Sequence, residues 1–303
     1  MTVQILLSTY NGEAYLRPLM DSVLAQDCSL VELLVRDDGS HDQTVPILRE
    51  YEAASSNVLV MPGKNLGIAR SFFQLLERSS PQADYLAFCD QDDVWQRDKI
   101  SRAVEWLQRG SPEIPALYCS RVTLADEDLS VIRVSEAPRR GLSFRNALVE
   151  SVVWGCTCVI NQAARRLLLR ESPRQAWVHD RWIYLVVSAF GLVRFDEEPR
   201  ILHRRHKTNA SRIPLALADR WKIQWAHFLK FGRQQRVVKQ AQEFHRIYGL
   251  ALCEEDRQTL ERFLGCRKRL WDRLRYAVSC DVYHQSRFGH LMLKSLLALD
   301  RIY

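Results

Sequence analysis

Three aspartates, Asp90, Asp92 and Asp93, follow an apolar stretch over residues 85–89. Side chains two residues apart in an extended chain point to the same face, so Asp90 and Asp92 can converge on one point. Carboxylates that close repel each other unless a cation lies between them, and Mg²⁺ is usually held by one or two carboxylates together with substrate phosphates. The pattern predicts a divalent metal, Mg²⁺ or Mn²⁺, that offsets charge on a departing nucleotide. A solvated acidic turn is the alternative.

A second acidic turn, Asp37-Asp38-Gly39-Ser40, follows an apolar run over residues 31–36. A turn that caps the next helix is one explanation. The functional alternative is that Asp37 accepts a hydrogen bond from the ring N3–H of uracil or thymine. The sequence contains neither G-x-x-x-x-G-K-[ST] nor a G-x-G-x-x-G after its first apolar run. A bound nucleotide would therefore be held by carboxylates and a metal instead of a glycine-rich loop.

The elements that position these acids alternate along the first half of the chain. Alternation of strands and helices predicts an α/β fold with a mostly parallel, Rossmann-like sheet, right-handed crossovers and flanking helices. Ligands of such sheets bind outside the carboxyl ends of the strands, where both acidic turns fall. The predicted strands span residues 3–8, 31–36, 58–61 and 85–89, and the predicted helices span residues 16–25, 44–53 and 67–77.

Further elements are expected in the second half of the catalytic region. Strands are predicted over residues 115–125 and 152–160, the second containing Trp154 and Gly155. Helices are predicted over residues 161–171 and 180–190, with Gly191 closing the latter. Residues 194–206 form an extended, charged run that predicts a strand or a loop.

The C-terminal region, residues 211–303, is expected to be mostly helical and basic, after a catalytic domain over residues 1–210 whose halves meet near residue 110. It holds 18 lysines and arginines against 9 acids in a chain of net charge +7. Basic residues beside aromatics favour a peripheral helix on an anionic membrane, with packing on the catalytic domain or on a second subunit as the alternative. No nucleic-acid reader motif is present. The aromatics are Trp221, Trp225, Phe228, Phe231, Phe263 and Trp271.

The sequence shows no signal peptide, and its longest apolar run, residues 183–193, is about half of a membrane span. The eight cysteines form no C-x-x-C pair, which argues against zinc and favours reduced thiols in the cytoplasm. Cys156 and Cys158 are expected to pack on one face of a strand.

Four motifs together resemble glycosyltransferase family 2 in order and spacing. They begin at Leu7, Arg36, Lys64 and Cys89 and read LSTYNG, RDDGS, KNLGIA and CDQDDVW. The later runs HDRW from His179, SAFG from Ser188 and LHRRH from Leu202 resemble a rhamnosyltransferase-like bacterial branch. The resemblance covers about residues 1–210. It implies a GT-A fold, a nucleotide-diphosphate sugar donor and inversion at the anomeric carbon.

The resemblance also implies roles for individual residues. Asp37 would meet the base, Asp90 the ribose or diphosphate, and Asp92 the metal, with His206 as a possible further ligand. Asp93 would be a second ligand, a supporting acid or a sugar contact. The remaining nucleotide contacts would be Thr9, Tyr10, Asn11, Asp38, Lys64, Arg70 and Gln91.

Inversion by single displacement needs a base for the acceptor hydroxyl. The resemblance implies Asp180, at the start of a predicted helix, although an acid there is also a good helix cap. Many family members have Glu-Asp where this chain has His179-Asp180, so His179 either orients the base or packs beside it. The expected contacts to sugar or acceptor are Trp95, Trp154, His179 and Arg205, with Trp177 a further stacking candidate.

The resulting hypothesis is transfer of a sugar to a growing bacterial surface glycan that is lipid-linked at the cytoplasmic leaflet. The rhamnosyltransferase-like resemblance suggests dTDP-L-rhamnose as donor, with UDP-hexoses as the alternative. Polyprenyl-phosphate sugar synthases, sugar nucleotidyltransferases and a non-enzymatic carbohydrate-binding protein are the competing interpretations. The retained acids argue against the last of these, and the missing glycine-rich start argues against a nucleotidyltransferase.

Overall fold

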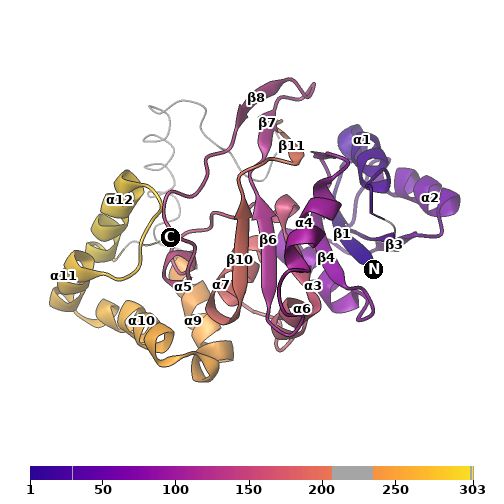
Figure 1. Cartoon of the computed structure of the whole chain (residues 1–303). Coiled ribbons are helices and arrows are strands. Elements are labelled where there is room, and N and C mark those ends of the chain that lie inside the picture. Colours follow the sequence, from indigo (N-terminus) through magenta and orange to yellow (C-terminus); the bar gives the residue numbers. More distant parts are fainter. Residues whose placement is uncertain (29, 207–234, 301, 303) are drawn as a thin grey trace. The chain divides into compact units, whose positions relative to one another are not determined.

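The computed structural model describes residues 1–28, 30–206, 235–300 and 302, which form two compact units. The first unit consists of Met1–Ala137, Val152–Ser172 and Val178–His206, and the second of Pro138–Ser151, Pro173–Trp177 and Lys207–Tyr303. Two short segments of the predicted catalytic domain therefore belong to the second unit. Figure 1 labels most of the elements of the two units.

A seven-stranded sheet in the order β10-β6-β9-β4-β1-β2-β3 forms the frame of the first unit. Only β9 runs antiparallel to its neighbours, β4 and β6, whereas the other pairs are parallel. The mostly parallel sheet expected from the sequence is thereby confirmed. Its strands are β1 (Val3–Thr9), β2 (Val31–Asp37), β3 (Val58–Pro62), β4 (Tyr85–Asp90), β6 (Ala116–Ser120), β9 (Val159–Asn161) and β10 (Leu192–Asp196).

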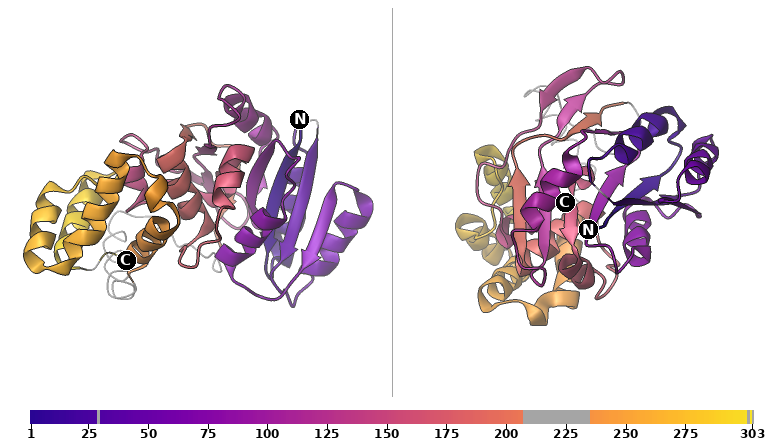
Figure 2. Two further views of the ribbon diagram at one scale, coloured as in Figure 1. Left: turned by 90° about the horizontal axis from the view of Figure 1, so that it is seen from below. Right: turned by 45° about the vertical axis from the view of Figure 1, so that its right-hand side comes forward.

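Helices flank this sheet, as Figure 2 shows in two further orientations. The central strand β1 has Val3, Ile5, Leu6 and Leu7 fully buried, because a strand covered on both faces must be apolar at nearly every position. The helices of this unit are α1 (Glu13–Leu24), α2 (Thr44–Ala54), α3 (Ile68–Arg78), α4 (Lys99–Leu107), α6 (Gln162–Leu168) and α7 (His179–Phe190).

A second sheet of four short strands, in the order β5-β11-β7-β8, belongs to the same unit. It contains β5 (Val94–Trp95), β7 (Thr123–Ala125), β8 (Val131–Val134) and β11 (Ile201–Arg204). β11 pairs antiparallel with β5, which directly follows the acidic motif. The small sheet therefore brings the end of the unit's last segment to Asp92 and Asp93.

Two expectations for this half of the unit were wrong in detail, whereas the expected helix end at Gly191 is confirmed. The strand predicted over residues 115–125 is two strands in different sheets, β6 and β7. Trp154 and Gly155 lie outside any strand, since a single 3₁₀ turn, η1 (Gly155–Thr157), precedes β9. Gly191 does end α7, but with φ −160° it is extended, so a left-handed cap is not the reason for glycine. A Cβ there would lie 1.9 Å from the Pro115 carbonyl oxygen.

The described part of the second unit is helical, as predicted. Leu260 and Phe263 pack inside it, whereas Trp271 is 76% exposed, so Phe263 is not a membrane-facing aromatic. Trp221, Trp225, Phe228 and Phe231 lie outside the described residues. Its elements are α5 (Phe144–Ala147), α9 (Arg236–Tyr248), η2 (Gly249–Ala251), α10 (Glu254–Gly265), η3 (Cys266–Lys268), α11 (Leu270–Ser279) and α12 (Arg287–Ala298).

Among the described residues of both units, no helix combines the length and the apolar character that crossing a membrane requires. All eight cysteines are free thiols, and Cys156 and Cys158 are both buried. The two do not share a strand face as predicted, because Cys156 belongs to η1 and Cys158 follows it.

Candidate active site

The carboxyl ends of β1, β2 and β4 meet at one edge of the large sheet and bring together residues from three motifs. Thr9 is in register with Asp37, and Ser8 with Asp90. The side chain of Gln91 accepts a hydrogen bond from the Tyr10 backbone N–H (2.7 Å) and donates to the Tyr10 carbonyl oxygen (3.0 Å). The motifs therefore converge as predicted. Gln91, which follows β4, holds the ends of β1 and β4 together through its two bonds with Tyr10.

Asp37 holds its own turn together. Its carboxylate accepts hydrogen bonds from the Thr9 and Ser40 hydroxyls at 3.0 and 2.6 Å and from the Gly39 and Ser40 backbone N–H groups at 3.0 and 2.8 Å. A carboxylate has about four lone-pair sites, so donors within the chain already fill them. This is the structural role weighed from the sequence. A contact from Asp37 to a base N–H would have to displace or share one of these bonds.

Asp38 is 3% exposed and faces the chain instead of a ligand. Its carboxylate accepts from the Leu66 and Gly67 backbone N–H groups (2.7 and 2.8 Å) and from the Arg36 guanidinium (2.5 Å). The prediction that Asp38 binds nucleotide is corrected, because its function here is to anchor the loop before α3. Asn11 has a similar local role, since its side chain accepts from the His41 backbone N–H at 2.9 Å.

The acids after β4 lie opposite two histidines of the segment that contains β11. His206 Nε2 lies 2.8 Å from Asp92 Oδ2, and His203 Nδ1 lies 2.8 Å from Asp93 Oδ1. The structure therefore brings together both residues predicted to bind the metal, although 114 positions separate them. His203 was noted in the sequence only as part of a basic run, and its pairing with Asp93 was not foreseen.

The carboxylates of Asp90, Asp92 and Asp93 lie close together, so added positive charge would stabilise their ionised forms. Burial, followed by the Asp93 and Asp92 carboxylates, raises the pKa of Asp90 well above its usual range. Burial and Asp93 likewise raise the pKa of Asp92. Burial opposes a charge on His203, but the carboxylates of Asp93, Asp92 and Asp90 together outweigh it and raise the pKa of that imidazole to about 9. A divalent cation beside Asp92 and His206 fits, because carboxylate and imidazole are donors that Mn²⁺ accepts.

Asp93 lies in the protein interior and does not face a substrate. It is fully buried, and its Oδ2 has no hydrogen-bond partner among the described residues. Donor atoms of Asp93, Cys156 and His203 lie within 4.8 Å of one another, so this buried group is a second place with metal-compatible donors. Direct contact of Asp93 with sugar or acceptor is not consistent with its burial.

Asp180 lies in the first turn of α7 and accepts a hydrogen bond from the Arg181 backbone N–H at 2.6 Å. Burial raises the pKa of Asp180 to about 6. A Cβ on Gly155 would lie 2.8 Å from His179 Nε2 and 3.6 Å from the Asp180 Cβ, so only glycine lets η1 approach α7 this closely. A carboxylate with a pKa near the operating pH has the property that a general base needs.

His179 and Trp95 are core residues, which corrects their assignment as sugar contacts. The His179 ring is stacked on Phe72 at 3.8 Å and lies 5.5 Å from Phe88, and burial lowers its pKa to about 3. Trp95 is 4% exposed. The Lys99 ammonium lies 3.3 Å from the Trp95 ring centroid, a contact that the sequence analysis missed.

The remaining residues predicted to contact donor or acceptor have fewer described contacts with the acidic cluster. Trp154 is half-buried and meets the His203 ring edge-on at 5.1 Å, so it borders the acidic cluster. Arg205 is half-buried, with its backbone N–H bonded to the Ala125 carbonyl. Lys64 and Arg70 are exposed near the carboxyl end of β3. Trp177 belongs to the second unit.

Tyr15 of α1 is a site neighbour that the sequence analysis did not single out. Its ring lies 4.6 Å from the His206 ring and 4.9 Å from the Arg204 guanidinium. Its position in the first turn of the helix that follows the first motif was the available signal. Tyr15 packs against His206 and so links α1 to the predicted metal ligands.

Residues 4–168 match the model of Glycosyl transferase family 2, and the chain belongs to that family. It is 25% identical over 220 residues to dTDP-rhamnosyl transferase RfbG of Shigella flexneri, covering 67% of this chain and 72% of that protein. It is also 25% identical over 236 residues to the putative teichuronic acid biosynthesis glycosyltransferase TuaG of Bacillus subtilis, covering 75% and 90%.

Solved structures confirm the GT-A fold expected from the resemblance. S. aureus TarS 1–349 in complex with UDP-GlcNAc superposes with a TM-score of 0.58 at 13% identity, covering 97% of this chain and 91% of that one. The mannosyltransferase PcManGT of Pyrobaculum calidifontis, in complex with GDP-Man and Mn²⁺, gives 0.52 at 17% identity, covering 98% and 85%.

Proposed function

We propose that this protein is an inverting, metal-dependent glycosyltransferase that uses a pyrimidine nucleoside-diphosphate sugar, with dTDP-L-rhamnose as the first candidate. The observation that supports it best is the meeting of Asp92 and His206 beside the β1, β2 and β4 strand ends. The similarity to a dTDP-rhamnosyl transferase supports the donor. A UDP-hexose is the alternative, because the only difference between uracil and thymine is a methyl group.

In this mechanism Asp180 takes the proton from the acceptor hydroxyl while its oxygen attacks the anomeric carbon. The bond from that carbon to the diphosphate oxygen breaks, and the nucleoside diphosphate departs with the electron pair. A divalent cation held by Asp92 and His206 would offset the charge on the leaving diphosphate. Asp93 and His203 form an ion pair in the interior, and this pair helps to hold the neighbouring Asp92 and His206 in position.

A screen of purified protein against dTDP-rhamnose, UDP-hexoses and GDP-mannose tests the donor, with release of free nucleotide as readout. We expect the highest rate with dTDP-rhamnose. The anomeric configuration of the product, read by NMR, tests inversion. Exclusive use of GDP-mannose would refute the pyrimidine donor, and nucleotide release without a glycoside product would indicate a hydrolase.

For the acceptor we propose a growing, lipid-linked surface glycan, reached by peripheral association with the cytoplasmic leaflet. The similarity to a teichuronic acid glycosyltransferase supports a surface glycan. The second unit supports the membrane: α11 exposes Leu270, Trp271 and Val278 at 52%, 76% and 78%, next to the exposed basic residues Arg269 and Arg275. Basic and apolar side chains on one helix suit an anionic headgroup layer.

Co-sedimentation with liposomes tests this association. Binding should increase with anionic lipid and decrease with salt. Trp271→Ser should weaken it severalfold, whereas Leu59→Ser, which removes a 56% exposed apolar side chain from the first unit, should not. Protein that stays in the supernatant with anionic vesicles at low salt would refute membrane association. Transfer of the sugar directly to a polyprenyl phosphate would indicate a polyprenyl-phosphate sugar synthase instead.

A further inference from the structure

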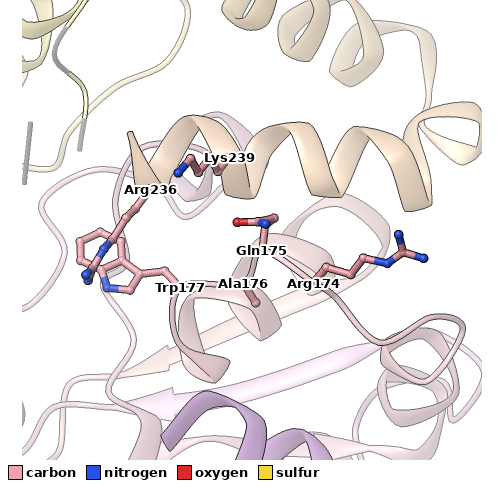
Figure 3. A pocket seen from close by; sticks show the side chains of 6 residues that line it. All are labelled: Arg174, Gln175, Ala176, Trp177, Arg236 and Lys239. Carbon is pink, nitrogen blue, oxygen red and sulfur yellow. The ribbon is translucent and has the colours of Figure 1, made fainter. Parts of the chain in front are cut away.

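The second unit contains a cavity of about 360 Å³ between α9 and the segment Pro173–Trp177. Figure 3 shows the side chains of the six residues that line it. Three of them are cationic, one is aromatic, and none is acidic. The lining residues are Arg174, Gln175, Ala176, Trp177, Arg236 and Lys239.

This cavity has a fixed wall. The Arg174 backbone N–H donates to Glu243 Oε1 at 2.7 Å, and the Trp177 backbone N–H donates to Gln240 Oε1 at 3.2 Å. Both acceptors are buried side chains of α9. The backbone of the segment is therefore attached to the helix at two points.

One cation of the cavity packs against its aromatic ring, and Glu243, which anchors the segment, is paired with an arginine outside the lining. The Arg236 guanidinium lies 5.3 Å from the Trp177 ring centroid, a distance at which cation and ring attract each other. Glu243 accepts from Arg246 at 2.8 and 3.1 Å in addition to its bond with Arg174, so its charge is already compensated. Among the described residues that line the cavity, positive charge thus exceeds negative charge.

We infer that this cavity binds a phosphate or diphosphate ester, with the Arg236 guanidinium and the Lys239 ammonium on the anion and the Trp177 ring beside the group that the phosphate carries. The Arg174 side chain points away from these three residues in Figure 3 and is left out of the proposed site. Guanidinium groups suit phosphate oxygens because they offer paired donors in one plane. The assignment of this ester as part of the acceptor rests on the proposed function, whereas the binding of phosphate itself does not.

Isothermal titration with inorganic pyrophosphate in EDTA tests the site without a contribution from metal-bound diphosphate. The double variant Arg236→Gln/Lys239→Gln should bind at least about tenfold more weakly than the wild type. Arg287→Gln/Lys294→Gln removes two cations from the same unit outside the cavity and should bind like the wild type. Equal weakening in both variants, or none in the first, would overturn the inference. Thermal melting shows whether each variant is folded.

The source of the phosphate is resolved by a second titration. Tighter binding of farnesyl diphosphate than of a water-soluble sugar phosphate supports a lipid-linked ligand, and the reverse order supports a soluble one. Both results require that binding is lost in the Arg236→Gln/Lys239→Gln variant. Binding of either compound that persists in this variant would overturn the inference.

A transfer assay separates this inference from the proposed function. With a diphosphate-linked acceptor, the cavity variant should show a KM for acceptor about tenfold higher, with kcat and the donor KM unchanged. With a neutral glycoside acceptor, variant and wild type should behave alike. An unchanged acceptor KM refutes the acceptor role of the cavity. The proposed function alone is refuted if the wild type transfers no sugar to any acceptor. The phosphate site still stands in that case if the wild type binds pyrophosphate and the Arg236→Gln/Lys239→Gln variant does not.

Discussion

Two groups of aspartates in this protein look alike in sequence and differ in their surroundings. Asp37 and Asp38 together accept seven hydrogen bonds from their own chain. Asp90 and Asp92, at the end of β4, have pKa values raised by burial and by the neighbouring carboxylates. A saturated carboxylate stabilises a loop, whereas carboxylates crowded together store unfavourable charge that a bound cation or a proton can relieve.

Asp180 belongs with the second group, since burial raises its pKa to about 6. The first prediction is that Asp180→Asn lowers kcat by roughly 10²–10⁴ because the proton acceptor is lost, with donor binding little changed. Steady-state kinetics with saturating donor measure this. An Asp180→Asn enzyme with near-normal turnover would place Asp180 with the structural aspartates as a helix cap.

The second prediction concerns Asp92. Asp92→Asn should lower transfer by about 10²–10³, the range seen when one electrostatic stabiliser is removed, and should weaken Mn²⁺ binding measured by titration. EDTA should abolish transfer in the wild type, and Mg²⁺ or Mn²⁺ should restore it. Full activity in EDTA would show that transfer does not need a divalent cation. The charge of the acids would then be offset by protons and by the histidines.

The third prediction is that Asp38→Asn destabilises the fold. The change leaves the Arg36 guanidinium, 4% exposed, without its charged partner, and breaking a buried pair in this way costs about 3–5 kcal/mol. Chemical denaturation gives the free energy of unfolding. At a temperature where the variant remains folded, transfer should stay within about tenfold of the wild type. A large loss of kcat in a folded Asp38→Asn protein would show that the loop anchor also contacts the donor.

The fourth prediction is that Asp180→Asn, in contrast to Asp38→Asn, increases the free energy of unfolding at high pH. A carboxylate whose pKa is raised by folding adds stability below its unfolded pKa and loses it as the pH rises through about 6. Removal of the charge should therefore stabilise the metal-free protein by about 1–3 kcal/mol at pH 8 and have little effect near pH 4. Destabilisation at pH 8 would mean that capping of α7 outweighs the buried charge.

The sequence predicted the strand ends and the positions of the acidic turns well, because apolar runs and the turns that follow them are local properties. It did not distinguish Asp38 from Asp92, since both lie in a short acidic turn. The difference lies in their partners: Asp38 meets backbone groups of Leu66 and Gly67, whereas Asp92 meets His206, 114 positions away. The burial of Trp95 likewise depends on Lys99 and on the small sheet, which no local pattern indicated.

The smallest expected effect is on the pH profile, and it tests the same distinction in the intact enzyme. If Asp180 is the base, turnover requires its ionised form, so the rate should fall about tenfold for each pH unit below a pKa near 6 and level off above it. Metal and donor bring charge of both signs, so the profile is measured with both saturating. Asp180→Glu keeps a carboxylate and should retain an acidic limb at a shifted pH, whereas Asp180→Asn should remove that limb from its residual rate. An acidic limb that is unchanged in Asp180→Asn would assign it to the 90–93 cluster, and the base would then have to be sought among those carboxylates.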